Sequence, residues 1–330
     1  MAQMLYLLTV DSRFYCLKLA GSLLRSAIAN RPEKQMLYRI TKFALPVLAL
    51  AGNTVGIMVN PAHAQQASIR AEKLPVGAGS EMTYADLAGL AEASDLVMTG
   101  IVRKASRLKP EQAPNVAPGM ARMLVETRTV AVLAGPATGE TVRYLADVPL
   151  DARGKPPKLT KLKVMVFART VVGRPGELAL VDGGAQVFWS ANVEARTRAI
   201  LTDLLSPEAP PRIKAVREVL FVPGNLAGEG ETQVFLQTQN GAPISLSVVR
   251  RPGMARTWGV SLSEIVDQSA RPPARDTLTW YRLACFLPQD IPPAASLSGG
   301  ETYAQAAEED YRFVLAQLGP CTRTRPIVKR

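Results

Sequence analysis

The sequence predicts an α+β, β-rich protein with two small antiparallel domains, barrel-like or sandwich-like, each packed by a helix. Three observations predict this class. Short runs of alternating apolar and polar residues recur along the chain, with the period of half-buried strands. Turn-forming Asn-Gly and Gly-Gly pairs separate these runs. Each half then ends with apolar residues at the spacing of an amphipathic helix. We therefore expect one domain over residues 82–206 and a second over residues 207–330.

In the first half, Thr83 and Asp86 form a capping-box pattern that predicts a helix ending near Ala93. The turn at 182–184 predicts a hairpin, and Asn192 is the expected cap of the helix that closes the domain. The alternating run at 162–167 predicts a half-buried strand. The strands are expected at residues 95–108, 130–134, 141–146, 162–167, 177–181 and 186–189.

The second half repeats this plan after the Pro-rich stretch at 207–211. Asn240-Gly241 predicts a hairpin. A last helix is expected from a capping box of Thr302 and Gln305 to Gly319-Pro320, with its acidic cluster, residues 308–310, on the solvated face opposite its apolar side. The strands are expected at residues 219–222, 233–239, 244–249, 256–260 and 278–286.

Residues 36–64 have the layout of a secretory signal peptide. Arg39 and Lys42 precede an apolar run at residues 43–59, and Ala62-His63-Ala64 forms the cleavage signature. This run of seventeen residues is short for a transmembrane helix, which needs roughly 20. We expect cleavage near Ala64-Gln65, a periplasmic location and no membrane anchor afterwards.

The residues flanking the signal are assigned separately. Translation from Met36 gives a signal of 29 residues and makes residues 1–35 an upstream extension; the alternative is an amphipathic leader that starts at Met1. Residues 65–81 are polar and Gly-rich and are expected to form a flexible linker.

An exported chain with two remaining cysteines, Cys285 and Cys321, predicts one disulfide, because oxidising compartments form and retain such bonds. The third cysteine, Cys16, lies in the extension. The predicted bond closes a loop of 37 residues, counting both ends, and ties the last helix to the sheet that it covers.

Charge and composition exclude several functions for the cleaved chain. The leader holds +5 of the formal net charge of +11, so the remainder carries +6, which is too little to indicate nucleic-acid binding. The only histidine, His63, leaves with the signal, and this removes histidine-dependent catalysis and histidine metal ligands. Phosphate-binding and calcium loops are missing from the sequence. We predict no cofactor and no metal.

No residue is assigned as catalytic. Ser106 and Lys109 match a Ser-x-x-Lys pattern, which requires both side chains on one helix face, but they lie at a strand end. Asp147, Glu177 and Asp182 are carboxylates that the sequence alone does not bring together.

Two basic segments are the candidate binding residues. One interpretation of the first segment is an anion-binding surface. The other is a solvent-exposed loop that leads into a strand and has no binding role. The second is a basic turn beside an aromatic residue, which either lines a groove or packs in the core. The first comprises Lys155, Lys158, Lys161 and Lys163, and the second Arg250, Arg251 and Trp258.

Residues 93–102 are similar to the opening of many secreted bacterial barrel domains. Trp258-Gly259-Val260-Ser261 followed by residues 280–285 resembles uncharacterised exported proteins of Gram-negative bacteria. This resemblance implies a periplasmic destination and transfers no site residue.

The leading hypothesis is a non-catalytic binding or envelope-associated module whose partner is an anionic envelope component or another periplasmic protein. One alternative is a hydrolase or lyase that uses carboxylates or a Ser/Lys pair. The other is a protease-inhibitor-like module that presents the loop at residues 109–119.

Overall fold

The computed structural model describes residues 82–263 and 269–325, all within one unit, Arg70–Arg330. The predicted extension, signal peptide and linker lie outside the described residues. Along the described chain the elements are α1 (Tyr84–Ala93), β1 (Leu96–Arg107), η1 (Pro110–Gln112), β2 (Met120–Ala134), β3 (Thr141–Pro149), β4 (Lys163–Thr170), β5 (Leu178–Leu180), β6 (Gln186–Phe188), α2 (Ala191–Leu205), β7 (Ile213–Pro223), β8 (Gly230–Thr238), β9 (Ile244–Arg250), β10 (Thr257–Ser261), α3 (Leu278–Phe286), η2 (Pro293–Ala295) and α4 (Glu301–Leu318).

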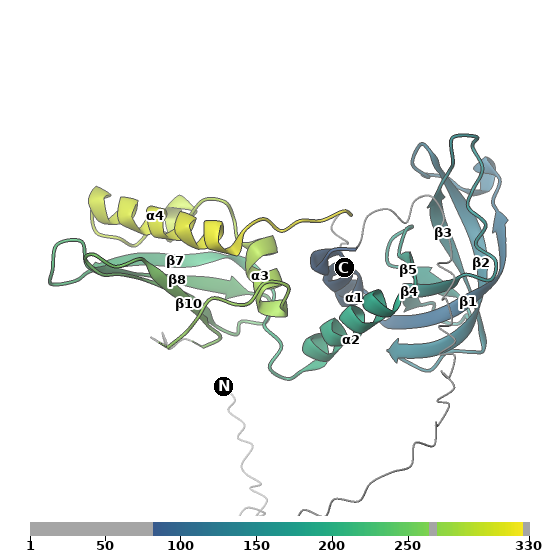
Figure 1. Ribbon diagram of the computed structural model, residues 1–330, viewed down its shortest axis with the longest axis horizontal. Coiled ribbons are helices and arrows are strands. Elements are labelled where there is room, and N and C mark those ends of the chain that lie inside the picture. The colour runs from purple at the N-terminus through teal and green to yellow at the C-terminus, as the bar shows by residue number, and fades with distance from the viewer. Residues whose placement is uncertain (1–81, 264–268, 326–330) are drawn as a thin grey trace, which may run out of the picture. The chain divides into compact units, whose positions relative to one another are not determined.

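The predicted α+β, β-rich class is confirmed. The first sheet has the order β3-β2-β1-β4-β5, with β6 also paired to β4, and the second has the order β10-β9-β8-β7. Every strand ladder in both sheets is antiparallel. Neither sheet closes into a barrel, so the sandwich-like description holds. In Figure 1, α4 runs along one face of the second sheet. The domain boundary near Pro207 stays a prediction.

Strand β4 is buried on both faces, which corrects the prediction of a half-buried strand. Val164 and Val166 face a core formed by the strands of the first sheet. Met165 and Phe167 face a second core, to which α1 and α2 contribute. Because α1 covers the face that the alternation assigned to solvent, all four side chains are fully buried.

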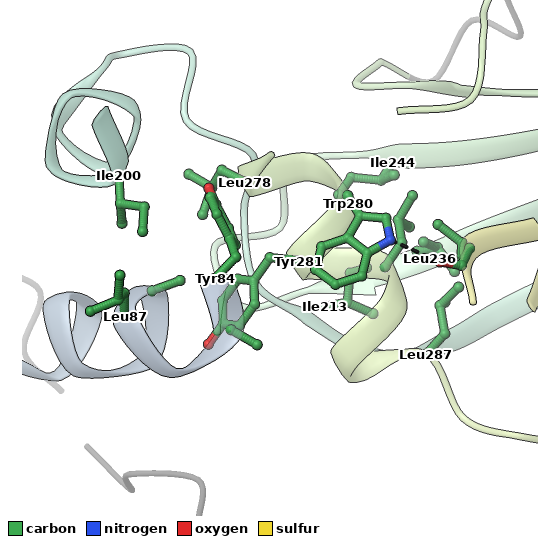
Figure 2. Packing of buried hydrophobic residues seen from close by; sticks show 14 of the residues in the cluster. Tyr84, Leu87, Ile200, Ile213, Leu236, Ile244, Leu278, Trp280, Tyr281 and Leu287 are labelled. Carbon is green, nitrogen blue, oxygen red and sulfur yellow. Dashed lines mark hydrogen bonds between the residues drawn. The ribbon is translucent and has the colours of Figure 1, made fainter. Parts of the chain in front are cut away.

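The second core continues from the helices to the sheet β7–β10. Figure 2 shows Leu87 of α1 and Ile200 of α2 pointing toward each other. In the same core, Tyr84 makes edge-to-face contacts with Trp280 and Tyr281, at centroid distances of 6.4 Å. Aromatic pairs prefer this geometry, which adds to the free energy gained by burial.

The predicted hairpin at 182–184 is wrong. β5 and β6 do not pair with each other; both pair with the same edge of β4, as two parts of one interrupted strand. The residues between them bulge toward β3, where the amide of Asp147 donates to the carbonyl of Gly183 at 2.6 Å. A Cβ at Gly183 would lie 2.3 Å from Oδ2 of Asp147, so this approach requires glycine.

Helix starts are confirmed in part. Thr83 and Asp86 form the predicted capping box of α1. Helix α2 is capped by Ser190 rather than by Asn192. Helix α4 begins directly after Gly300, so the predicted box of Thr302 and Gln305 is wrong. Its predicted end is confirmed, because Gly319 takes a positive φ of 69° that favours glycine.

Residues 278–286 form helix α3, not the predicted strand. The hydroxyl of Thr277 accepts a hydrogen bond from the amide of Trp280 and caps this helix. Burial against the second core then outweighs the strand preference of its aromatic residues. The indole N–H of Trp280 donates to the carbonyl of Leu318 at 2.9 Å.

The predicted disulfide between Cys285 and Cys321 is confirmed. It joins the end of α3 to the segment after α4, so it links two helices rather than a helix and a strand. Among the described helices, none is both long and apolar enough to cross a membrane.

The predicted hairpin of the second sheet is confirmed. β8 and β9 pair in register from Gly230–Arg250 to Leu236–Ile244, around the turn that contains Asn240-Gly241. Gly241 takes a φ of 78° in this turn. β10 adds to β9 and forms one edge of the sheet, while β7 forms the other. This sheet carries the candidate site.

Candidate binding groove

A groove of about 840 Å³ opens on the second sheet. It lies at the end of the sheet where β7 and β9 finish and β8 and β10 begin. Its walls are the turn between β7 and β8 and the segment at residues 270–272, which returns over the sheet after β10, and Phe313 and Gln317 of α4 also line it. This volume lies within the range of roughly 300–1,000 Å³ that ligand pockets occupy.

The floor of the groove is a polar patch on three neighbouring strands. The strand register places Glu231, Val249 and Thr257 in one row across the sheet. Gln233, Ser247 and Gly259 form the next row. Side chains two residues apart on a strand share a face, so all six positions belong to the face opposite α4.

The returning segment approaches this floor closely. A Cβ at Gly259 would lie 2.4 Å from the carbonyl carbon of Ala270, so only glycine admits the segment at this distance. The amide of Val260 donates to the carbonyl of Arg271 at 3.4 Å. The wall is therefore attached to the edge of β10 as well as resting on its face.

Four arginines line the groove: Arg250, Arg251, Arg256 and Arg271. Arg251 and Arg271 are both exposed, and neither is in an ion pair among the described residues. One guanidinium nitrogen of Arg271, Nη1, donates to the carbonyls of Ser269 at 2.8 Å and Ala270 at 3.0 Å. These bonds hold Arg271 against its own segment, and among the described residues the rest of its guanidinium makes no hydrogen bond.

Arg250, the neighbour of Arg251, is bound on the other face of the sheet. Its Nε donates to both carboxylate oxygens of Asp310 at 2.8 Å, and its Nη2 donates to the carbonyl of Ala306 at 2.6 Å. Arg256 adds a contact to Asp310 at 3.4 Å, and the hydroxyl of Thr232 donates to it at 2.6 Å. Arg250 thus holds α4 on the sheet.

The expectation that residues 308–310 are all solvated is wrong for Asp310, which is completely buried. The helix turns this carboxylate toward the sheet, where two arginines compensate its charge. A buried carboxylate requires such partners, because its desolvation is otherwise too costly.

Trp258 lies on the same face as Asp310 and is 6% exposed. It belongs to the second core and also borders the groove. Its indole N–H is buried and has no hydrogen-bond partner within the described part of the chain.

None of the four candidate lysines lines the groove. Lys155, Lys158 and Lys161 are exposed in the loop before β4. Lys163 is engaged: its Nζ lies 3.5 Å from the ring centroid of Trp189 and 3.8 Å from Oε2 of Glu194. The structure therefore separates the lysine segment from Arg251.

Hydrogen bonds to Glu194 support the same cluster. The indole N–H of Trp189 and the guanidinium of Arg198 both donate to its carboxylate and lower its pKa, with the indole bond the larger cause. Lys163 thus faces a carboxylate that stays ionised. This pairing indicates that Lys163 has a structural role and is not a cation free to bind a ligand.

The carboxylates considered for catalysis are each paired with an arginine. Asp147 binds Arg122 through two hydrogen bonds at 2.7 and 2.8 Å, and Asp182 binds Arg325 at 2.5 Å. Glu177 contacts Arg174 at 3.2 Å. Ser106 lies on β1 and shares no helix with Lys109, so the Ser-x-x-Lys geometry is not formed. Within residues 82–263 and 269–325, no group of three His, Cys, Asp or Glu side chains is placed to hold a metal ion.

We call the segment Cys321–Arg325, which begins at the second cysteine of the disulfide, the C-terminal strap. The amide and hydroxyl of Thr324 donate to Asp86 of α1, and Arg323 donates to the carbonyl of Ala85 at 3.1 Å. Burial alone would raise the pKa of Asp86, but the hydrogen bonds from Thr324 and Thr83 outweigh it and lower the pKa. The strap thus fastens α1 with an ionised carboxylate.

A half-buried carboxylate, Glu92, joins α1 to the chain before β7 and to α3. It accepts from Arg212 and Arg282, each at 2.6 Å. These bonds outweigh the effect of burial and lower its pKa.

Beside α1, a cavity of about 460 Å³ is bordered by Tyr84 and Trp280. Burial, with Asp203 and Asp276 as further causes, raises the pKa of Tyr84, so its hydroxyl stays neutral.

Sequence reasoning named Arg250, Arg251 and Trp258, which all line the groove, and missed the rest of it. Arg271 stands alone between prolines and small residues, with no pattern that marks it. Glu231 and Gln233 gave a usable signal, because polar residues two apart in a strand indicate an open face. Neither a protein-family model nor a curated protein matches the chain.

Proposed function

We propose that this protein is an exported, non-catalytic binding module that holds an anionic ligand of the cell envelope in the groove of the second sheet. One observation carries the proposal: Arg251 and Arg271 stand without an ion-pair partner among the described residues, above a floor of polar side chains. The signal-peptide pattern and the disulfide support export to an oxidising compartment.

The rim of the groove, where Arg251 and Arg271 lie, favours an anion, and two carboxylates, Glu229 and Glu231, also line the groove. Arg250 and Arg256 are compensated by Asp310 and Glu309. The carboxylate of Glu229 accepts hydrogen bonds from the backbone amides of Asn225 and Leu226. Arg251 and Arg271 therefore remain as cations available to a ligand. Arginine binds carboxylate and phosphate groups through two parallel hydrogen bonds, which gives orientation as well as affinity.

The proposal is tested by titration calorimetry of the purified protein with three anionic probes: inorganic phosphate, a polyglutamate peptide and a short oligogalacturonate. The variant R251Q/R271Q removes both rim charges. Its matched control is K214Q, which removes an exposed cation near the opposite end of the same sheet. We expect at least one probe to bind to the wild type and to K214Q, and to bind R251Q/R271Q at least tenfold more weakly. Equal binding of every probe by the two variants would contradict the proposal.

A further inference from the structure

We infer that the ligand is a carboxylated oligosaccharide, a chain rich in hydroxyl groups that carries carboxylates along its length. This inference rests on the proposed function and names its ligand class. It follows from the chemistry of the floor, from the charge above it and from the closed edge of β10.

The floor offers both donors and acceptors. Gln233 supplies an amide, and Ser247 and Thr257 supply hydroxyls, all of which donate and accept. Glu231 supplies a carboxylate that only accepts, and it takes a hydrogen bond from Gln233 at 3.3 Å. Each hydroxyl of a sugar also donates and accepts, so a sugar satisfies this mixture more fully than a ligand with acceptors only.

The carboxylate of Glu231 also selects against a dense polyanion. A sulfated or phosphorylated chain lying on the floor would place several negative charges near this carboxylate, at a cost in repulsion. A uronic-acid chain turns neutral hydroxyls to Glu231 and reaches Arg251 and Arg271 at the rim with its carboxylates. Neighbouring strands lie about 4.8 Å apart, so the polar side chains of Glu231, Gln233, Ser247 and Thr257 are spread over three strands, with Val249 and Gly259 among them.

An extended acidic peptide fits less well. Such a peptide would bind by adding a strand to an exposed edge. β10 is the edge strand beside the returning segment, but it has only five residues, and the carbonyl of Arg271 already accepts a hydrogen bond from the amide of Val260. Outward-facing amides alternate along a strand, so little of this edge remains for a peptide.

The test compares ligands that differ in one property. A short oligogalacturonate is titrated beside its methyl ester, which keeps the free ring hydroxyls and loses the charge. Polyglutamate and a heparin oligosaccharide supply the competing anion classes. We expect the oligogalacturonate to bind at least tenfold more tightly than each of the other three.

Two floor variants test the hydroxyl contacts. Q233L keeps the approximate size of the side chain and removes its hydrogen bonds, and T257V does the same at an exposed position. We expect each to weaken oligogalacturonate binding about tenfold, as loss of a hydrogen bond typically does. Thermal melts within a few degrees of the wild type serve as the folding control, and T257V remains informative if Q233L fails to fold.

The outcomes separate the two proposals. If polyglutamate or heparin binds as tightly as the oligogalacturonate and still depends on Arg251 and Arg271, the sugar inference is overturned and the anion-binding function stands. The sugar inference alone falls if both floor variants bind like the wild type. If the methyl ester binds as tightly as the oligogalacturonate, the carboxylates contribute nothing, and the sugar inference and the proposed function are both overturned. If no anionic probe binds, both are overturned as well.

Discussion

Adjacent arginines at the end of β9 should respond in opposite ways to truncation. Arg250 pairs with the buried Asp310, whereas Arg251 is exposed at the groove. Replacing Arg250 by Ala leaves the carboxylate buried with only Arg256 and Thr232. Breaking a buried pair costs about 3–5 kcal/mol. Because Arg256 remains, we expect about 3 kcal/mol, at the lower end of that range. For R251A we expect a change within about 0.5 kcal/mol, as for other exposed positions.

Urea and thermal denaturation measure both changes. A loss of about 3 kcal/mol lowers Tm by about 6–12 °C in a domain of this size. A double-mutant cycle with R250M and D310N isolates the pair, and we expect a coupling free energy of about 2 kcal/mol. Ligand binding should show the reverse order, with R251A weaker and any folded Arg250 variant close to wild type. Equal melts for R250A and R251A would refute the assignment of Arg250 to structure.

Three further predictions concern the disulfide, acid and the groove wall. Reduction of Cys285–Cys321 should destabilise the protein by up to about 4 kcal/mol from loop entropy; an unchanged melt in reductant would show that the bond contributes nothing. Asp86 and Glu92 have pKa values below their ordinary 3.8 and 4.5, so the stability that they supply is complete above about pH 5 and is lost as pH falls through their lowered values. Urea midpoints between pH 7 and 3 should show this decline, with a shallower slope in D86N. G259A should lower the free energy of unfolding by about 1–3 kcal/mol, because its Cβ would meet Ala270. The control G139A should have a smaller effect, because its Cβ would lie 3.6 Å from the nearest atom. Similar melting temperatures for the two variants would contradict the close approach.

Local signals predicted several elements correctly. The capping box of Thr83 and Asp86, the Asn240-Gly241 hairpin and the end of α4 at Gly319 depend on hydrogen bonds and φ angles within a few residues. The disulfide was predictable because only two cysteines, with one possible pairing, follow the predicted signal peptide.

The errors share a different origin. Residues 278–286 contain aromatic residues typical of strands, yet they form α3 because the second core takes Trp280 and Tyr281 together. Two consecutive positions on a strand would point to opposite faces. β4 looked half-buried because nothing in its own alternation reveals that α1 covers its second face.

By itself, the sequence determined the α+β, β-rich class, the hairpin of the second sheet and the cysteine pairing, because each depends on periodicity, turn residues or counting. Only the tertiary structure decided which of two neighbouring arginines in the groove is exposed without an ion pair among the described residues. Arg250, the last residue of β9, pairs with Asp310 of α4, whereas Arg251 follows the strand and is exposed. The groove itself combines strand register with a returning segment at 270–272, and contacts between residues so far apart leave no mark in a local pattern.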